Sequence, residues 1–295
     1  MAITAQDVKV LREKTGAGMM DCKKALTECD GDIEKASEWL REKGIAKAAK
    51  KAGRIAAEGA TKVAVNGNVA TIFEVNSETD FVAKNEQFID LLAKIETCLL
   101  TNKPATMEAA LACEVEGKTL EALVTDATAT IGEKITFRRY EVVEKSDDES
   151  FGAYIHMGGK ISALVVLEGG NEVVAKDVAM QVASMSPQFV SREHMPAEVV
   201  ENERHVQLEI LKNDAALASK PEKVLHGIVE GRLTKALQEM SLVDQIYFKD
   251  PNVKVGDYVK SNNATVKSFV RYAVGEGIEK RSENFAEEVM NQIKG

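Results

Sequence analysis

Two internal repeats constrain the fold of this chain more than any other feature. Residues 161–176 (ISALVVLEGGNEVVAK) align without a gap on residues 69–84 (VATIFEVNSETDFVAK), at a constant offset of 92 positions. A second echo, FRRYEV at residues 137–142 and FVRYAV at residues 269–274, has an offset of 132. Because the offsets differ by about 40 positions, we predict two related α+β units, the second of which carries an insertion of that size.

The apolar pattern of the first unit predicts a β-hairpin followed by a long helix. Residues 61–75 alternate around Asn66-Gly67-Asn68, and Asn-Gly supplies the positive φ that a tight hairpin loop needs. A helix is expected next, over about residues 80–100, and Ser77 is expected to cap its start. Its buried stripe is expected to consist of Phe88, Leu92, Ile95 and Leu99. One or two helices over residues 106–131 and a strand over 134–143 are expected to complete this unit.

The second unit repeats this plan around an inserted helical hairpin. Strands are expected at residues 151–156, 161–167 and 266–274, with a helix through residues 176–185. Two further helical patterns occupy residues 196–217 and 221–240. The first of them has an apolar seam formed by Val199, Val206, Ile210 and Leu217. These apolar residues are expected to pack either on the second helix of the hairpin or on another subunit.

Three short helices are expected at the N-terminus. Thr4 and Asp7 form a capping-box pattern for the first, and Gly44 is expected to end the third. Met19 and Met20 are adjacent in the second helix, so both cannot point into one small core. At least one of these methionines should be exposed.

We therefore predict an α+β chain with small antiparallel sheets and six segments. They are an N-terminal three-helix module (1–46), a linker (47–60), a first core subdomain (61–145), a second core subdomain (151–190 and 241–275), an inserted helical hairpin (191–240), and a C-terminal module with a short helix (276–295).

Composition favours a protein partner over nucleic acid or a membrane. The net charge of −9 and pI of about 5.2 argue against broad binding to a phosphate backbone. No run approaches the eighteen or so apolar residues that a membrane span needs. The N-terminus has neither a basic start nor an apolar stretch, so we expect a cytoplasmic address.

The sequence contains no constellation typical of an enzyme. The four cysteines have no CxxC spacing, and the four histidines lack a recognisable metal or nucleophile partner. A phosphate-cradling loop is absent, because Gly159-Lys160 is followed by Ile161 and Tyr154 stands where the first glycine should fall. We expect no enzymatic activity, cofactor or metal.

Two segments carry a resemblance to a known family. Residues 11–26 (LREKTGAGMMDCKKAL) and 74–84 (EVNSETDFVAK) resemble both signature motifs of the bacterial elongation factor Ts family, the guanine nucleotide exchange factors of elongation factor Tu. The resemblance spans nearly the whole chain. It implies a ubiquitin-associated-type N-terminal module, a coiled-coil arm at the inserted hairpin, and elongation factor Tu as the partner.

The resemblance also assigns roles to particular residues. It implies that Thr79, Asp80, Phe81 and Val82 enter the GTP-binding domain of the partner, where Phe81 acts as a wedge and Asp80 disturbs magnesium coordination. Further partner contacts are implied, near the same domain or farther from the nucleotide, for Leu11, Met19, Met20, His156, Met157 and Gly158.

Two alternatives stay open at this point. In a continuous helix Phe81 would share a face with Phe88, so it could be a core residue while Asp80 serves as a cap. The repeat has Val173 in place of Phe81, which, with the resemblance, favours a specialised role for the aromatic ring.

The competing class of function is an adaptor or scaffold whose helical bundle captures another protein. A homodimer or a two-plus-two complex through the hairpin or the core is a further expectation.

Overall fold

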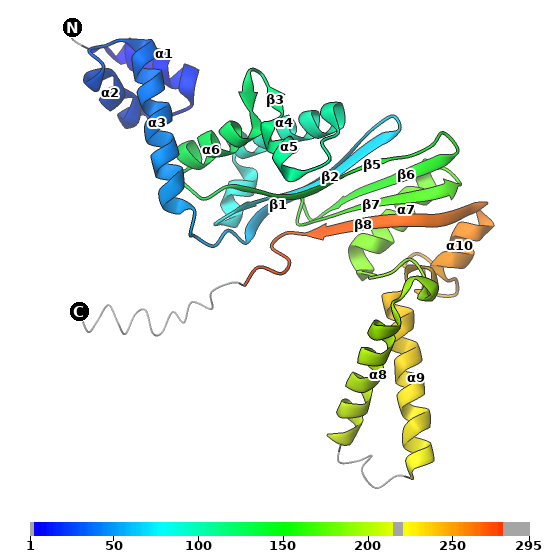
Figure 1. Ribbon diagram of the computed structural model, residues 1–295. Coiled ribbons are helices and arrows are strands. Elements are labelled where there is room, and N and C mark those ends of the chain that lie inside the picture. The colour runs from blue at the N-terminus through cyan, green and yellow to red at the C-terminus, as the bar shows by residue number, and fades with distance from the viewer. Residues whose placement is uncertain (1–2, 215–220, 280–295) are drawn as a thin grey trace, which may run out of the picture. The chain divides into compact units, whose positions relative to one another are not determined.

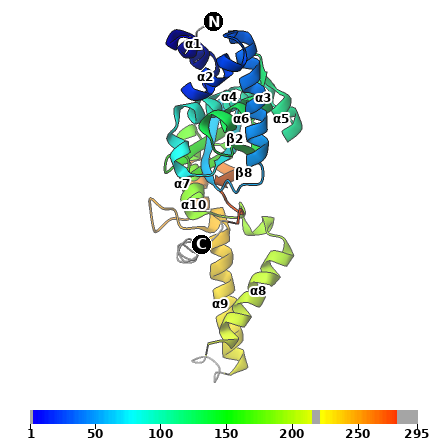
Figure 2. The same cartoon turned by 90° about the vertical axis from the view of Figure 1, so that its left-hand side faces the viewer.

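The computed structural model describes residues 3–214 and 221–279 and has an α+β fold (Figures 1 and 2). Its contacts divide it into two compact units. The first comprises described residues up to 62, residues 73–142 and residues 272–279, and the second comprises 63–72 and 143–271. Leu217 of the expected seam and the expected C-terminal helix lie outside the described residues. In the part of the chain that the structure describes, no helix is both long and apolar enough to cross a bilayer.

The N-terminal module is the three-helix bundle that the sequence predicts. It consists of α1 (Ala5–Thr15), α2 (Met19–Glu28) and α3 (Ile33–Lys51). The amide of Thr4 donates to the Asp7 carboxylate at 2.9 Å and the Asp7 amide donates to Oγ1 of Thr4 at 3.2 Å, which confirms the capping box.

The third helix does not end at Gly44, so that expectation was wrong. A Cβ at Gly44 would lie 3.2 Å from the Cβ of Ala129, so the glycine lets α3 pass close to α6 (Leu120–Ile131). Helix α3 therefore continues to Lys51, inside the segment expected to be a linker. Strand β1 begins at Glu58.

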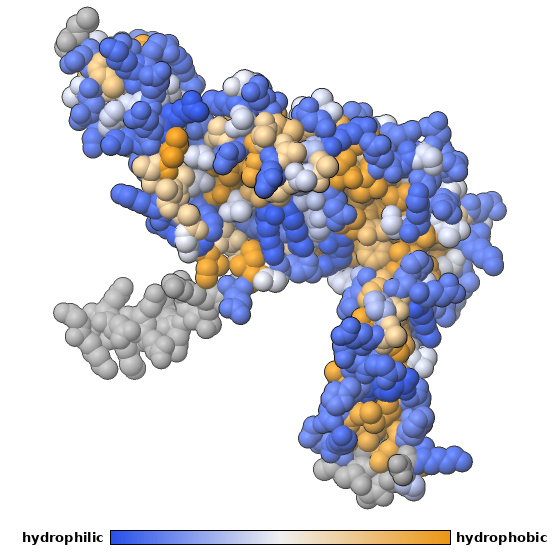
Figure 3. Space-filling model, in the orientation of Figure 1, coloured by the Kyte–Doolittle hydropathy of each residue, from blue (hydrophilic) through white to orange (hydrophobic). Residues whose placement is uncertain are grey.

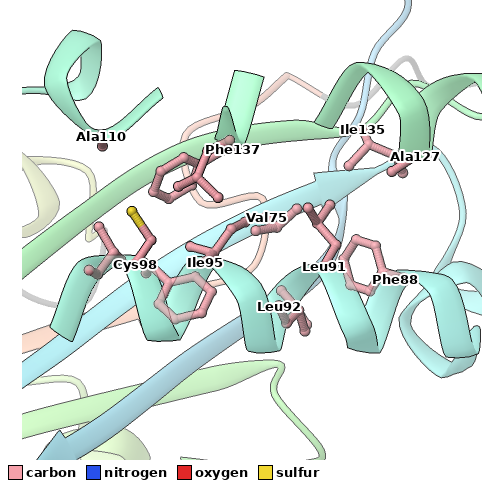
Figure 4. Close-up of a cluster of buried hydrophobic side chains, with 14 of the residues drawn as sticks. Val75, Phe88, Leu91, Leu92, Ile95, Cys98, Ala110, Ala127, Ile135 and Phe137 are labelled. Atoms are coloured by element: carbon pink, nitrogen blue, oxygen red, sulfur yellow. The ribbon is translucent and has the colours of Figure 1, made fainter. Parts of the chain in front are cut away.

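The first sheet has the strand order β1-β2-β5, with β1 (Glu58–Asn66), β2 (Val69–Ser77) and β5 (Thr136–Glu144). The expected hairpin is confirmed, and Gly67 in its two-residue loop has φ +58°. Helix α4 (Glu86–Asn102) buries the predicted stripe against this sheet, and Figure 4 shows its side chains beside Val75, Ile135 and Phe137. Helix α5 (Met107–Ala112) and the short strands β3 (Glu114–Val115) and β4 (Lys118–Thr119) complete the region.

The second sheet repeats the first in order. It consists of β6 (Glu149–His156), β7 (Ile161–Gly169) and β8 (Ala264–Ala273), with β6 and β7 antiparallel. Strands β2 and β7 begin at Val69 and Ile161, the first residues of the aligned repeat. Helix α7 (Glu172–Met185) packs on β6 and β7, as the equivalent of the helical segment after β2. Helix α10 (Val255–Ser261) was not predicted.

An inserted pair of helices, α8 (Ala197–Lys212) and α9 (Glu222–Met240), forms the expected hairpin. The predicted seam was wrong in part, because Val206 and Ile210 are exposed and Leu211 is buried. The inward face of α8 also carries Arg204, whose guanidinium pairs with Glu230 of α9. Because the face of α8 that packs on α9 carries a charged residue, the spacing of apolar residues alone did not identify that face.

A buried carboxylate ties the first unit together. Glu74 of β2 is fully buried and accepts hydrogen bonds from Arg138 Nη1 at 3.1 Å, Arg139 Nε at 2.6 Å, the Gly275 amide at 2.7 Å and Asn76 Nδ2 at 2.9 Å. These donors come from β2, β5 and the segment that follows β8. The charge is thus fully compensated, as a buried charge requires.

Neighbouring contacts strengthen the same junction. The guanidinium of Arg139 lies 4.2 Å from the centroid of the Tyr272 ring and donates to the carbonyl oxygen of Ala273 at 3.2 Å. The Tyr272 hydroxyl donates to Glu141 at 2.9 Å. Residues more than 130 positions apart in sequence are therefore joined around Glu74.

We predict that Glu74→Gln destabilises the protein by about 3 kcal/mol, because it removes the charge that compensates two arginines in a largely buried site. Denaturant unfolding measures this difference. A loss below about 0.5 kcal/mol, the range of an ordinary surface substitution, would contradict the role assigned to Glu74.

The same residue predicts a pH dependence. Burial acts to raise the pKa of Glu74, but hydrogen bonds from Gly275, Asn76 and Arg139 outweigh burial and lower the pKa below the ordinary value of 4.5. The stabilisation is therefore complete above that ordinary value and is lost as pH falls through the lower pKa of the folded state. The difference in unfolding free energy between wild type and Glu74→Gln should shrink on acidification. A difference independent of pH would contradict this assignment.

Candidate partner-binding site

The loop at residues 78–82 follows directly from the end of β2. Ser77 is the last strand residue, and a 3-10 helix, η1 (Asp80–Lys84), comes next. Helix α4 begins only after Asn85, whose side chain accepts from the Gln87 amide at 2.8 Å. The expected continuous helix from Asp80 was therefore wrong, and so was Ser77 as its cap, since the Ser77 hydroxyl donates to the Thr79 carbonyl at 2.8 Å.

This interruption decides where Phe81 points. Its side chain is 82% exposed, whereas Val82 is 6% exposed and belongs to the core with Phe88. The alternative in which Phe81 is a core residue is thus excluded for this structure. The side chain of Val82 is buried in the protein itself, and its contact with a partner stays a prediction.

Asp80 is exposed beside Phe81. Among the described residues, its carboxylate has no hydrogen-bond or ion-pair partner. Large apolar side chains such as the Phe81 ring are normally buried, so its exposure is unusual. The neighbouring Asp80 carboxylate is also free of hydrogen-bond and ion-pair contacts within the described residues. The pair can contact a partner without any rearrangement of the core.

Polar contacts fix the base of this loop. Glu78 accepts from the Lys134 amide at 2.6 Å and from Arg54 Nη1 at 3.2 Å. Glu133 accepts from both the amide and the hydroxyl of Thr79, at 2.9 and 2.6 Å. The connection between α6 and β5 therefore holds the loop from one side. Sequence reasoning missed Glu133, because nothing in a single sequence pairs it with a residue 54 positions away.

The N-terminal bundle carries a second exposed apolar group. Met19 and Met20 are 59% and 74% exposed, as the sequence predicted for at least one of them. They line a groove of about 400 Å³, whose other walls include Ile3, Val8, Lys9, Arg12 and Lys23. Leu11 is fully buried in the core of the bundle, and its contact with a partner stays a prediction.

A third group lies in the second unit, at the turn between β6 and β7. Met157 is 71% exposed with φ +50°, and Gly158 has φ +65°. His156 is half-buried, and its Nδ1 lies 3.2 Å from the Tyr154 hydroxyl. This turn exposes a flexible apolar side chain of the kind that adapts to a protein surface.

In residues 3–214 and 221–279, no group of three His, Cys, Asp or Glu is placed to hold a metal ion. The four cysteines are free, and burial raises the pKa of the Cys98 thiol to about 12, which keeps it unreactive. What this region can supply is apolar and charged contact to another molecule.

We predict that Phe81→Ala changes the free energy of unfolding by less than about 0.5 kcal/mol, because the ring is exposed. Val82→Ala should cost about 1.5 to 3 kcal/mol, since it removes buried methyl groups from the core. Chemical denaturation of the two variants measures both effects. Equal destabilisation by the two substitutions would show that Phe81 packs inside the fold.

Comparison with protein-family models agrees with the sequence motifs. Residues 78–276, about two thirds of the chain, match the model described as elongation factor TS. Residues 1–52 match the model described as elongation factor Ts, mitochondrial, N-terminal. The matched regions include the 78–82 loop, the turn at His156 and the methionine groove. The chain belongs to the elongation factor Ts family.

Proposed function

We propose that this protein is a guanine nucleotide exchange factor that promotes GDP release from elongation factor Tu. The observation that carries the proposal is the exposed Phe81 beside an uncommitted Asp80, on a loop whose base is fixed. Phe81 inserts between apolar side chains of the partner near its nucleotide site. Asp80 and the adjoining backbone at Thr79 disturb the magnesium ion that the partner holds against the diphosphate.

The thermodynamics of exchange require no covalent step. A factor that binds the nucleotide-free partner more tightly than the GDP-bound partner weakens GDP binding by the same ratio. A ratio of about ten-thousand-fold needs roughly 5.5 kcal/mol of differential binding. Burial of one phenylalanine supplies only about 1.5 to 3 kcal/mol. Phe81 therefore requires help from lost magnesium contacts and from a wider interface.

Met19 and Met20 are proposed to supply part of that wider interface. Their groove has an apolar floor and a rim carrying Lys9, Arg12 and Lys23. In this proposal the bundle rests on a helix of the nucleotide-binding domain, and Leu11 keeps α1 in place beneath the groove. His156, Met157 and Gly158 contact the partner farther from the nucleotide.

Self-association and cellular address stay predictions. Exposed Val206, Leu208 and Ile210 on α8 leave apolar surface on the hairpin, part of which Figure 3 shows, and a dimer through the hairpin or the core would use such surface. A cytoplasmic address is expected from the sequence, while the N-terminal model that matches carries the word mitochondrial in its description. No direct contact with nucleic acid is expected.

The adaptor hypothesis is the competing function. It uses the same exposed methionines to capture another protein and assigns no role to the 78–82 loop. The two hypotheses differ in one measurable respect, because only an exchange factor accelerates nucleotide release.

We predict that catalytic amounts of the wild-type protein accelerate release of labelled GDP from purified elongation factor Tu. Phe81→Ala should lower the saturating rate by about 10- to 100-fold, the kinetic equivalent of the lost burial. Asp80→Ala should lower it as well. Stopped-flow fluorescence with a fluorescent GDP measures these rates.

Val173→Ala is the matched control for this experiment. Val173 occupies the position of Phe81 in the repeat and is 70% exposed, so its truncation removes a comparable exposed apolar group outside the proposed site. This variant should retain the wild-type rate. Failure of the wild type to accelerate release would overturn the proposed function in favour of an adaptor.

A further inference from the structure

The two copies of the repeat handle the same helix start in different ways. Thr79 and Asn171 occupy equivalent positions, and both have an extended backbone, with φ −122° and φ −152°. Asn171 caps α7 conventionally, because its Oδ1 accepts from the amides of Val173 and Val174 at 3.0 and 3.1 Å. An α-helix follows at once in that copy.

Thr79 is a residue type that also caps helices, but it makes no capping hydrogen bond here. Its hydroxyl instead donates to Glu133 Oε1 at 2.6 Å, and its amide donates to Glu133 Oε2 at 2.9 Å. The Ser77 hydroxyl satisfies its carbonyl. The amide, hydroxyl and carbonyl of Thr79 therefore all make hydrogen bonds to groups outside the helix that follows.

The consequence is visible in the next residues. Without a capped start, the chain forms the 3-10 turn η1, and the α-helix begins only at Glu86. In the other copy the capped helix starts at once and Val173, the equivalent of Phe81, is 70% exposed, so the 3-10 turn is not needed for exposure. What the turn changes is the path of the backbone at residue 81 and hence the place of the exposed Phe81 ring.

Glu133 belongs to a larger group of contacts that holds the loop against the α6–β5 connection. Lys134 donates its amide to Glu78 and its Nζ to the carbonyl of Arg54 at 2.9 Å. Lys51, the last residue of α3, donates to the carbonyl of Gly132 at 2.5 Å. Residues 132–134 thus lie between the end of α3 and the 78–82 loop and contact both.

We propose that Glu133 is a positioning residue, which fixes the place of the exposed Phe81 ring by holding the amide and hydroxyl of Thr79 away from the helix start. This inference rests on the proposed function for its kinetic consequence, but its structural content concerns the free protein alone. Removal of the carboxylate releases the Thr79 hydroxyl to cap, as Asn171 does in the other copy. The loop then samples helical conformations in which the Phe81 ring, although exposed, points in a different direction.

The test uses the full-length protein carrying 4-fluorophenylalanine at position 81 and compares wild type with Glu133→Ala and Glu133→Gln. In Glu133→Ala the Thr79 amide should exchange with solvent at least about tenfold faster, because it loses a charge-assisted hydrogen bond. The fluorine resonance of residue 81 should shift or broaden. Glu133→Gln keeps one carbonyl acceptor and should restore part of the amide protection.

Glu121→Ala is the matched control, since it removes an exposed carboxylate from the first turn of α6 and makes no contact with the loop. It should leave the amide, the fluorine signal and the exchange rate unchanged. Thermal unfolding of each variant establishes that it is folded. If Glu133→Ala fails to fold, Glu133→Gln alone decides the test, and the Thr79 amide should exchange faster in it than in wild type.

The rate of GDP release from the partner then measures whether the position of Phe81, set by Glu133, affects exchange. The saturating rate should fall about tenfold in Glu133→Ala, an effect of about 1.4 kcal/mol on the barrier, with partial rescue by Glu133→Gln. Unchanged protection of the Thr79 amide and an unchanged fluorine signal in Glu133→Ala would overturn the proposal. If the wild type itself does not accelerate release, the proposed function falls, and the measurements on the free protein alone decide the role of Glu133.

Discussion

A single buried carboxylate supports the architecture of the first unit. Glu74 has no exposure to water, and each of its oxygens accepts hydrogen bonds from groups on β2, β5 or the segment after β8. Leaving such a charge unpaired would cost several kcal/mol, so burial of Glu74 is favourable only when these segments meet. This requirement explains how the end of β8, late in the chain, becomes part of the unit that contains β2.

The same strand delivers the candidate binding loop. Glu74 fixes β2 four residues before Glu78, and the contacts of Glu78 and Thr79 fix the loop itself. The polar groups at the loop base are satisfied within the protein, while the ring of Phe81 is left to solvent. A preorganised apolar anchor of this kind loses little conformational entropy when it meets a partner. That property suits a factor that must compete with a tightly held nucleotide.

Much of this arrangement could be predicted from sequence because it is local or periodic. The hairpin around Gly67, the stripe on α4 and the capping box at Thr4 follow from short-range rules. The repeat predicted two related α+β units, and their sheets have matching strand orders. The motif at residues 74–84 located the loop that carries Asp80 and Phe81.

The errors have a common physical origin in tertiary contacts that local rules do not include. Gly44 is a close-packing position against Ala129 and not a helix end, and Arg204 on the packed face of α8 hid the contact line. Glu133 diverts Thr79 from capping, which interrupts the helix expected from Asp80. Local rules also did not predict that Leu11 and Val82, two residues of the motifs, have buried side chains in the free protein.

The central claim is that Phe81 reaches the nucleotide site of another molecule while the rest of its loop stays anchored in this protein. A crystal structure of the complex with nucleotide-free elongation factor Tu measures this directly. The account predicts that the Phe81 ring is enclosed by partner side chains beside the vacated phosphate and magnesium site, with the contacts between Thr79 and Glu133 intact. A complex in which Phe81 remains in solvent, or lies far from that site, would contradict it.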